Sequence, residues 1–149
     1  MPVVDKDYIV RVVKQIGDLF ARLLKLIEKR EYEQAIRALH SACPGLLGLD
    51  WEPLTFSDAE TAAKLLVERE KVKIFAQLVA KEAEILELKG DDSSANDKRR
   101  FALELWAEAL LRGAPLNPEQ TSAVRALTER VGASVVGERY AAALAKVAT

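Results

Sequence analysis

The sequence has 149 residues, of which 50% are hydrophobic and 30% are charged. Its 22 Lys and Arg residues and 23 Asp and Glu residues give a net charge of -1. This balance argues against a nucleic-acid partner, because proteins of that class cluster Lys and Arg on their binding surface. The length suits a single domain, residues 1–149, or one short array of helical hairpins, and it needs neither metal nor disulfide for stability.

No secreted or membrane-spanning segment is expected. The sequence begins without a basic region that leads into an apolar run. The longest stretch without charged residues, residues 38–49, is too short to span a bilayer. The single cysteine, Cys43, forms no intramolecular disulfide and fits a reducing compartment. We therefore expect a cytoplasmic protein with no membrane partner.

The composition predicts an all-α fold of about seven helices. Leu and Ala contribute 44 residues, whereas Val, Ile and Thr contribute 24. Leu and Ala are strong helix formers, and β-branched residues favour strands. No segment alternates polar and apolar residues as a half-buried strand does.

The first predicted helix covers residues 7–29, and the second covers residues 31–43. Gly17 lies inside the first helix and indicates either a close helix crossing or a tolerated glycine. Pro44 and Gly45 are expected to end the second helix, because a proline disfavours helical geometry in the residue before it. The apolar residues of the first helix recur at the spacing of one helix face. They are Ile9, Val12, Val13, Ile16, Phe20, Leu23 and Ile27.

Residues 46–56 are predicted to form an apolar loop. Trp51, Leu54 and Phe56 are its large side chains, and we expect them to anchor the loop in the core. A binding site built from these three residues is the less favoured interpretation.

Two predicted helices follow, over residues 58–69 and 71–89. Ser57 and Glu60 have the spacing of a capping box at the start of the first. Gly90 is suited to end the second. The sequence leaves open whether the two helices are continuous.

The polar segment of residues 91–97 is predicted to be a solvent-exposed loop, because it lacks any large apolar residue. It is not a calcium loop of the EF-hand type, since the twelfth position from Asp91 is Ala102 and not a glutamate. The next predicted helix covers residues 97–112.

The last two predicted helices, over residues 118–131 and 134–147, form a C-terminal hairpin within residues 114–149. Asn117 and Gln120 have the spacing of a capping box at the start of this hairpin.

Two segments share a spacing of alanine, a large residue and alanine. These are Ala35, Leu39 and Ala42, and then Ala102, Trp106 and Ala109. They lie 67 residues apart, close to two periods of a repeat of about 34 residues. Residues 30–36 resemble the start of the second helix of a tetratricopeptide repeat, although Glu82 falls where such a repeat usually has a leucine. The resemblance implies a tetratricopeptide-like stack of antiparallel helical hairpins.

A second resemblance rests on residues 7–11, 15–17 and 46–50. They are similar to an uncharacterised family of bacterial helical domains, and the similarity covers residues 1–111. It implies a bacterial source and a repeat-like fold, with residues 114–149 as an addition, but it implies no functional residues.

Few residues have the chemistry of an active site. His40 is the only histidine, and with Cys43 it supplies two potential metal ligands, too few for a structural zinc site. Cys43 lies at a predicted helix end, where the dipole raises the pKa of a thiol and disfavours a nucleophile. The glycines form no phosphate-binding motif.

The remaining charged candidates are expected on solvated helix faces. The carboxylate pairs are Glu82 with Glu84 and Glu104 with Glu108. Residues 98–100, Lys-Arg-Arg, form the densest basic cluster, for which we expect a solvated turn, or less favourably a carboxylate or phosphate partner.

These observations predict no catalytic, cofactor-binding or metal-binding residue, and hence no enzyme. The expected function is protein–protein interaction, as an adaptor or scaffold that presents a helical groove to another protein or peptide. The alternative is a structural homo-oligomer that packs through the apolar face of residues 7–29 or through the alanine-rich last helix.

Overall fold

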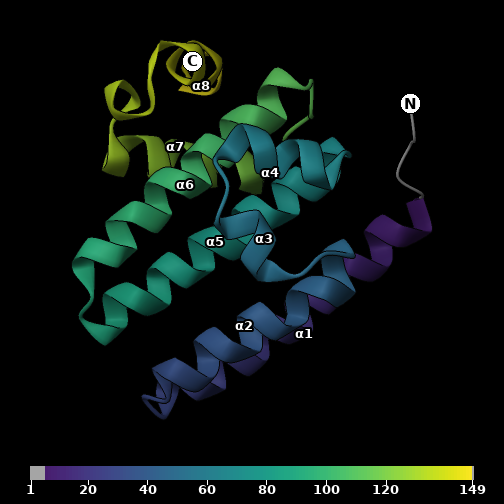
Figure 1. Cartoon of the computed structure of the whole chain (residues 1–149), viewed down its shortest axis with the longest axis vertical. Helices are drawn as coiled ribbons and strands as arrows, with labels where there is room; N and C mark the ends of the chain where they lie inside the picture. Colours follow the sequence, from purple (N-terminus) through teal and green to yellow (C-terminus); the bar gives the residue numbers. More distant parts are fainter. Residues whose placement is uncertain (1–5, 149) are drawn as a thin grey trace.

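The chain folds into helices alone over residues 6–148, the part that the computed structural model describes (Figure 1). The all-α prediction is confirmed, with eight α-helices and one short 3₁₀ helix in this part of the chain where about seven helices were expected. The elements are α1 (Lys6–Glu28), α2 (Tyr32–Leu47), α3 (Trp51–Thr55), α4 (Ala59–Leu66), α5 (Arg69–Lys89), α6 (Asp92–Leu111), α7 (Pro118–Val131), η1 (Ala133–Val136) and α8 (Glu138–Ala148).

Helix α2 does not end at Pro44, so the predicted stop is wrong. The helix continues to Leu47 because Leu46 and Leu47 are buried, and their burial offsets the hydrogen bond that proline cannot donate. Gly48 ends the helix in the left-handed conformation (φ 76°) and donates its N–H to the Pro44 carbonyl.

The segment after α2 contains the short helix α3 where an apolar loop was expected. Trp51 and Leu54 are buried, as predicted. Phe56 is 87% exposed, so its predicted anchoring role is wrong. A helix has one inward face, and Phe56 follows the last residue of α3 on the outward side.

Helix α4 is capped by Asp58, whose carboxylate accepts a 2.8 Å hydrogen bond from the Thr61 N–H. The predicted capping box at Ser57 is therefore wrong, because the Ser57 hydroxyl instead donates to the carbonyl oxygens of Pro53 and Leu54. The helical geometry is interrupted between α4 and α5 at Val67, which has a φ of 69°. The two helices are separate.

Helices α5 and α6 form the central hairpin. Gly90 ends α5 in the left-handed conformation (φ 97°), as predicted. Residues 92–97 are the first turns of α6, so the predicted loop is wrong. The Asp91 carboxylate caps the helix by accepting from the Ser94 N–H, and Ala95 is fully buried. These two contacts hold a polar segment in a helix.

The C-terminal region packs on α6. The predicted capping box of α7 is confirmed, since the side chains of Asn117 and Gln120 each bind the other residue's N–H. The predicted helix over residues 134–147 is divided at Gly137 (φ 90°) into η1 and α8. Its inward residues include Val136 and Leu144, which are buried.

Helices α1, α5 and α7 run in the same direction. The ammonium of Lys71 lies over the Tyr8 ring and that of Lys81 over the Phe20 ring, so residue numbers rise together along α1 and α5. Along α5 and α7, Lys73 contacts Gln120 and Glu87 contacts Arg130. Helices α2 and α6 return in the opposite direction, each packed against α5 (Figure 1).

Candidate groove between α1 and α7

A surface depression of about 370 Å³ lies between α1 and α7, with α5 and α6 as its floor. Its volume lies within the range of small-molecule sites. The lining residues are Phe20 from α1, Gln77, Ala80, Lys81 and Glu84 from α5, Arg99 and Trp106 from α6, and Ala123, Ala126, Leu127 and Arg130 from α7.

A smaller hollow of about 70 Å³ lies nearer the N-terminal ends of α1, α5 and α7. Gln77 lines both depressions, so they are adjacent, and we name the two together the α1–α7 groove. The smaller hollow is lined by Ile9, Val12, Val13 and Ile16 of α1, Glu70, Lys73, Ile74 and Gln77 of α5, and Gln120 of α7.

The floor and walls of the wider part of the groove are mainly apolar. Trp106 is almost completely buried beneath it, and Phe20 and Leu127 are half-buried at its sides. Ala123 and Ala126, on the α7 wall, have small side chains that leave room in the groove. Large apolar surfaces below and small residues at the side suit the apolar face of a helix.

The charges at the rim of this wider part are paired within the chain. Arg99 and Arg130 both form ion pairs with Glu87. Lys81 lies 2.9 Å from Glu84, and its ammonium is 4.6 Å from the centre of the Phe20 ring. Burial lowers the pKa of Arg99, and the nearby charge of Arg130 adds to this shift. The rim is therefore polar but close to neutral.

The narrow end of the groove is held by Lys73, a buried residue of α5. Its ammonium donates to the Pro115 carbonyl at 2.7 Å and to the Gln120 side chain at 3.2 Å, and it lies 2.9 Å from Glu70. These bonds join α5 to the segment that precedes α7. They position the beginning of α7 relative to α5, and hence one wall of the groove.

The opposite wall continues onto an uncovered face of α1. Val10, Val13 and Leu24 are 65%, 64% and 56% exposed, although the sequence pattern placed Val13 in the core. Gly17 lies between them on the same face. The sequence spacing predicted one apolar face for α1, and among the described residues part of the apolar surface of this helix has no neighbour.

Glu82 was expected on a solvated helix face, and the structure places it in the interior, 3% exposed. The His40 imidazole donates to one carboxylate oxygen, and Lys98 lies 3.2 Å from the other. Burial alone raises the pKa of Glu82, but the hydrogen bond from His40 and the charges of Lys98 and His40 outweigh it and lower the pKa. His40 also stacks on Trp51, with ring centres 4.6 Å apart.

Cys43, three residues after His40, is fully buried on α2. Burial, aided by the charge of Asp50, raises the pKa of its thiol to about 12. A thiol with this pKa is protonated at neutral pH and is a poor nucleophile. His40 forms its hydrogen bond with Glu82, whereas Cys43 is a buried thiol.

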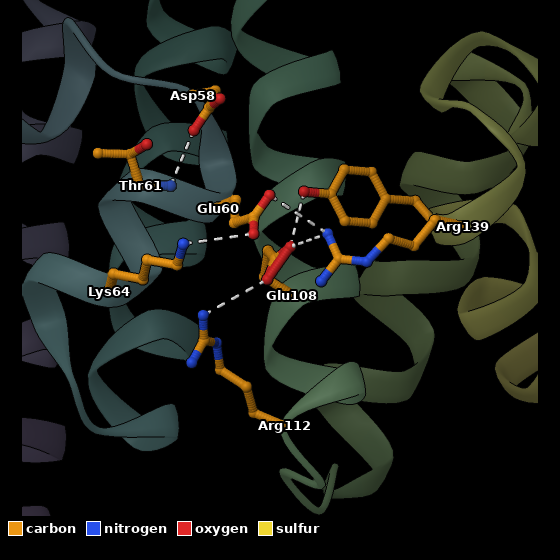
Figure 2. Close-up of polar contacts among 8 residues, drawn as sticks. Asp58, Glu60, Thr61, Lys64, Glu108, Arg112 and Arg139 are labelled. Atoms are coloured by element: carbon orange, nitrogen blue, oxygen red, sulfur yellow. Dashed lines mark hydrogen bonds and ion pairs between the residues drawn. The ribbon is translucent and has the colours of Figure 1, made fainter.

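Glu108 was also expected on a solvated face and is instead 1% exposed (Figure 2). Its carboxylate accepts from the Tyr140 hydroxyl at 2.7 Å and from Arg139 at 3.0 Å, and Arg112 lies 3.6 Å away. Burial raises the pKa of Tyr140, and the hydrogen bond to Glu108 raises it further. Arg139 also reaches Glu60 on α4, so this cluster joins α4, α6 and α8.

The basic cluster of residues 98–100 makes contacts within the chain. Lys98 pairs with Glu82, Arg99 with Glu87, and Arg100 lies 3.7 Å from Glu104. The expectation of a solvated turn is wrong for Arg99, which is 7% exposed. The carboxylate alternative is the one that the structure shows. The sequence did not identify the partners of Lys98 and Arg99, because Glu82 and Glu87 lie on α5.

Metal and membrane chemistry add no further candidate. Among residues 6–148, no group of three His, Cys, Asp or Glu side chains is arranged to hold a metal ion. In the same part of the chain, every helix is too short or too polar to cross a bilayer.

No protein family model matches the chain, and no curated protein or solved structure is significantly similar to it. The similarity of residues 1–111 to a bacterial helical family therefore stays a prediction from the sequence. The α1–α7 groove is a candidate binding site on the part of the chain that the structure describes.

Proposed function

We propose that the protein is a non-enzymatic protein–protein interaction module, an adaptor or scaffold that binds a helix or peptide of another protein in the α1–α7 groove. The observation that supports it is the parallel arrangement of α1, α5 and α7 around one apolar depression. In a tetratricopeptide-like stack, the first helices of successive hairpins line such a groove. We propose the same organisation here, in a cytoplasmic protein.

The dimensions of the groove suit a helical segment. On α5 it extends from Glu70 to Glu84, which corresponds to about 21 Å at 1.5 Å per residue. This length accommodates about four turns of a partner helix. Binding would bury apolar side chains against Phe20, Trp106 and Leu127, and the exposed Glu84 would contact the polar edge of the partner.

Site-specific photocrosslinking in cells tests the proposal. A benzoylphenylalanine at Ala126, an exposed groove residue on α7, should crosslink the partner protein. The same amino acid at Ala142, an exposed alanine of α8, is the matched control and should give no product. When Ala123→Trp is added to the protein that carries benzoylphenylalanine at position 126, the tryptophan should fill the groove and abolish the crosslink to the partner. Equal crosslinking at both positions, or at neither, would contradict the proposal.

The alternative function, a structural homo-oligomer, is favoured by a different observation. Val10, Val13 and Leu24 expose apolar side chains on a face of α1 that extends beyond the groove. Oligomerisation through this face would not be affected by Ala123→Trp on α7. Sedimentation of that variant therefore separates the two functions.

A further inference from the structure

The uncovered face of α1 has an unusual distribution of charge. At 100° per residue, seven residues lie within a sector of about 80° on one side of the helix. They are Lys6, Val10, Val13, Gly17, Ala21, Leu24 and Glu28, which we name the α1 outer face. Its two charged residues are at its ends, and the five residues between them are uncharged.

Exposed apolar side chains at the end of a helical stack need an explanation. A terminal helix in a stacked-hairpin protein normally has a polar outer surface, which keeps the protein soluble. Here the polar residues of α1, such as Asp18 and Arg22, lie on a separate side of the helix. The outer face therefore has the composition of a contact surface.

The residues of the outer face are symmetric about Gly17. Val13 and Ala21 lie four positions before and after it, and Val10 and Leu24 lie seven positions before and after it. Lys6 precedes Gly17 by eleven positions, and Glu28 follows it by eleven. Two antiparallel copies of α1 that cross at Gly17 would thus place apolar residues against apolar residues. Lys6 of each copy would lie beside Glu28 of the other copy, so this charge pair would occur twice.

Among residues 6–148, none packs so closely on Gly17 that a glycine is required there. A Cβ atom at this position would meet no atom within 4 Å. The residue lies inside a regular helix, where glycine stabilises the helix less than alanine does. A glycine lets a second helix backbone approach closely at that point. The position at the centre of the symmetric face is the one where two copies would come closest.

We propose that the protein forms a homodimer in which the α1 outer faces of two copies pack antiparallel across a two-fold axis at Gly17. The interface is isologous, since each residue pair occurs twice. Charge complementarity selects this orientation, because a parallel pair would place Lys6 beside Lys6 and Glu28 beside Glu28. The proposal goes beyond the groove: Val13 belongs to both surfaces, but most of the residues that line the groove lie on α5, α6 and α7 and remain available.

Sedimentation velocity over a range of concentrations tests the dimer and its charge pairs. The parent protein should sediment as a dimer at micromolar concentration. Lys6→Glu and Glu28→Lys should each weaken dimerisation about tenfold at low salt, and the double variant Lys6→Glu/Glu28→Lys should restore it. Leu65→Glu, an exposed apolar residue of α4, is the control and should leave the dimer unchanged. A monomeric parent, or a double variant no better than the single ones, would overturn the proposal.

Disulfide formation tests the orientation on a folded protein. In an oxidised equimolar mixture of Val10→Cys and Leu24→Cys proteins, the mixed dimer should form faster than either self-linked dimer. Cys43 is buried and does not interfere. Faster self-linking of Val10→Cys would indicate a parallel dimer and overturn the proposal. A parent that is monomeric yet crosslinks a different protein through Ala126 would overturn the dimer and leave the proposed function intact.

Discussion

The Tyr140 hydroxyl donates a 2.7 Å hydrogen bond to the carboxylate of Glu108, a residue that precedes it by 32 positions. Tyr140 belongs to α8 and Glu108 to α6, so this bond fastens the C-terminal helix to the central hairpin. Glu108 is buried, and its charge is acceptable there because Tyr140 and Arg139 both donate to it (Figure 2).

Removal of this hydroxyl should destabilise the protein. Tyr140→Phe leaves the buried Glu108 carboxylate short of one donor, and we expect the free energy of unfolding to fall by about 1–3 kcal/mol. Urea denaturation followed by circular dichroism measures the change. Tyr32→Phe, at a half-buried tyrosine that begins α2, is the matched control and should alter the value by less than about 0.5 kcal/mol.

Glu82 should contribute stability that depends on pH. Its pKa is lower in the folded protein than in the unfolded chain, so the unfolded state binds more protons as the solution becomes acidic. The contribution is complete above the unfolded pKa of about 4.3 and is lost as the pH falls through the lower folded pKa. The difference in unfolding free energy between the parent and Glu82→Gln should therefore shrink from pH 6 to pH 3.

Glu84→Gln is the control for this experiment, because Glu84 lies on the same helix but is exposed and pairs with Lys81 at the surface. Its effect should be below about 1 kcal/mol at pH 6. If both variants showed the same loss of stability and the same pH dependence, the interior ion pairs of Glu82 would not be the cause.

Replacement of Gly17 should affect folding and association in opposite directions. Gly17→Ala removes a mid-helix glycine at an open position and should raise the stability of the isolated subunit by up to about 1 kcal/mol. The same change should weaken the proposed dimer. Gly90→Ala, at a glycine with a φ of 97°, is the comparison and should lower the stability. Thermal unfolding under conditions that keep both variants monomeric measures the change in subunit stability for Gly17→Ala and for Gly90→Ala.

Two buried alanines should not accept a larger side chain. Ala35 and Ala109 are fully buried, and replacement of either by Leu should cost about 1–3 kcal/mol through overpacking. Ala145→Leu, at an exposed position of α8, should have little effect. Urea midpoints equal to that of the parent would show that the helices have room at these contacts.

Local signals in the sequence determined the helical class and several helix ends. The Asn117 and Gln120 pair predicted its own capping box, and Gly90 predicted the end of α5, because both signals act within one helical turn. The apolar spacing of residues 7–29 predicted α1. It did not show which part of its broad apolar surface lacks a neighbour, because periodicity does not specify what packs against a face.

Tertiary contacts decided the features that contradict the local signals. Pro44 stays inside α2 because the leucines after it are buried, and the polar residues 92–97 are helical because Asp91 caps them and Ala95 packs in the core. Glu82 and Glu108 are acceptable in the interior only because cations and donors arrive from helices distant in sequence. The α1–α7 groove has the same origin, since it depends on the spacing of helices that no local pattern connects. The sequence by itself thus determined the helical class and several helix ends, and the packing of the helices decided which further segments are helical, where charges are buried and where the surface is hollowed.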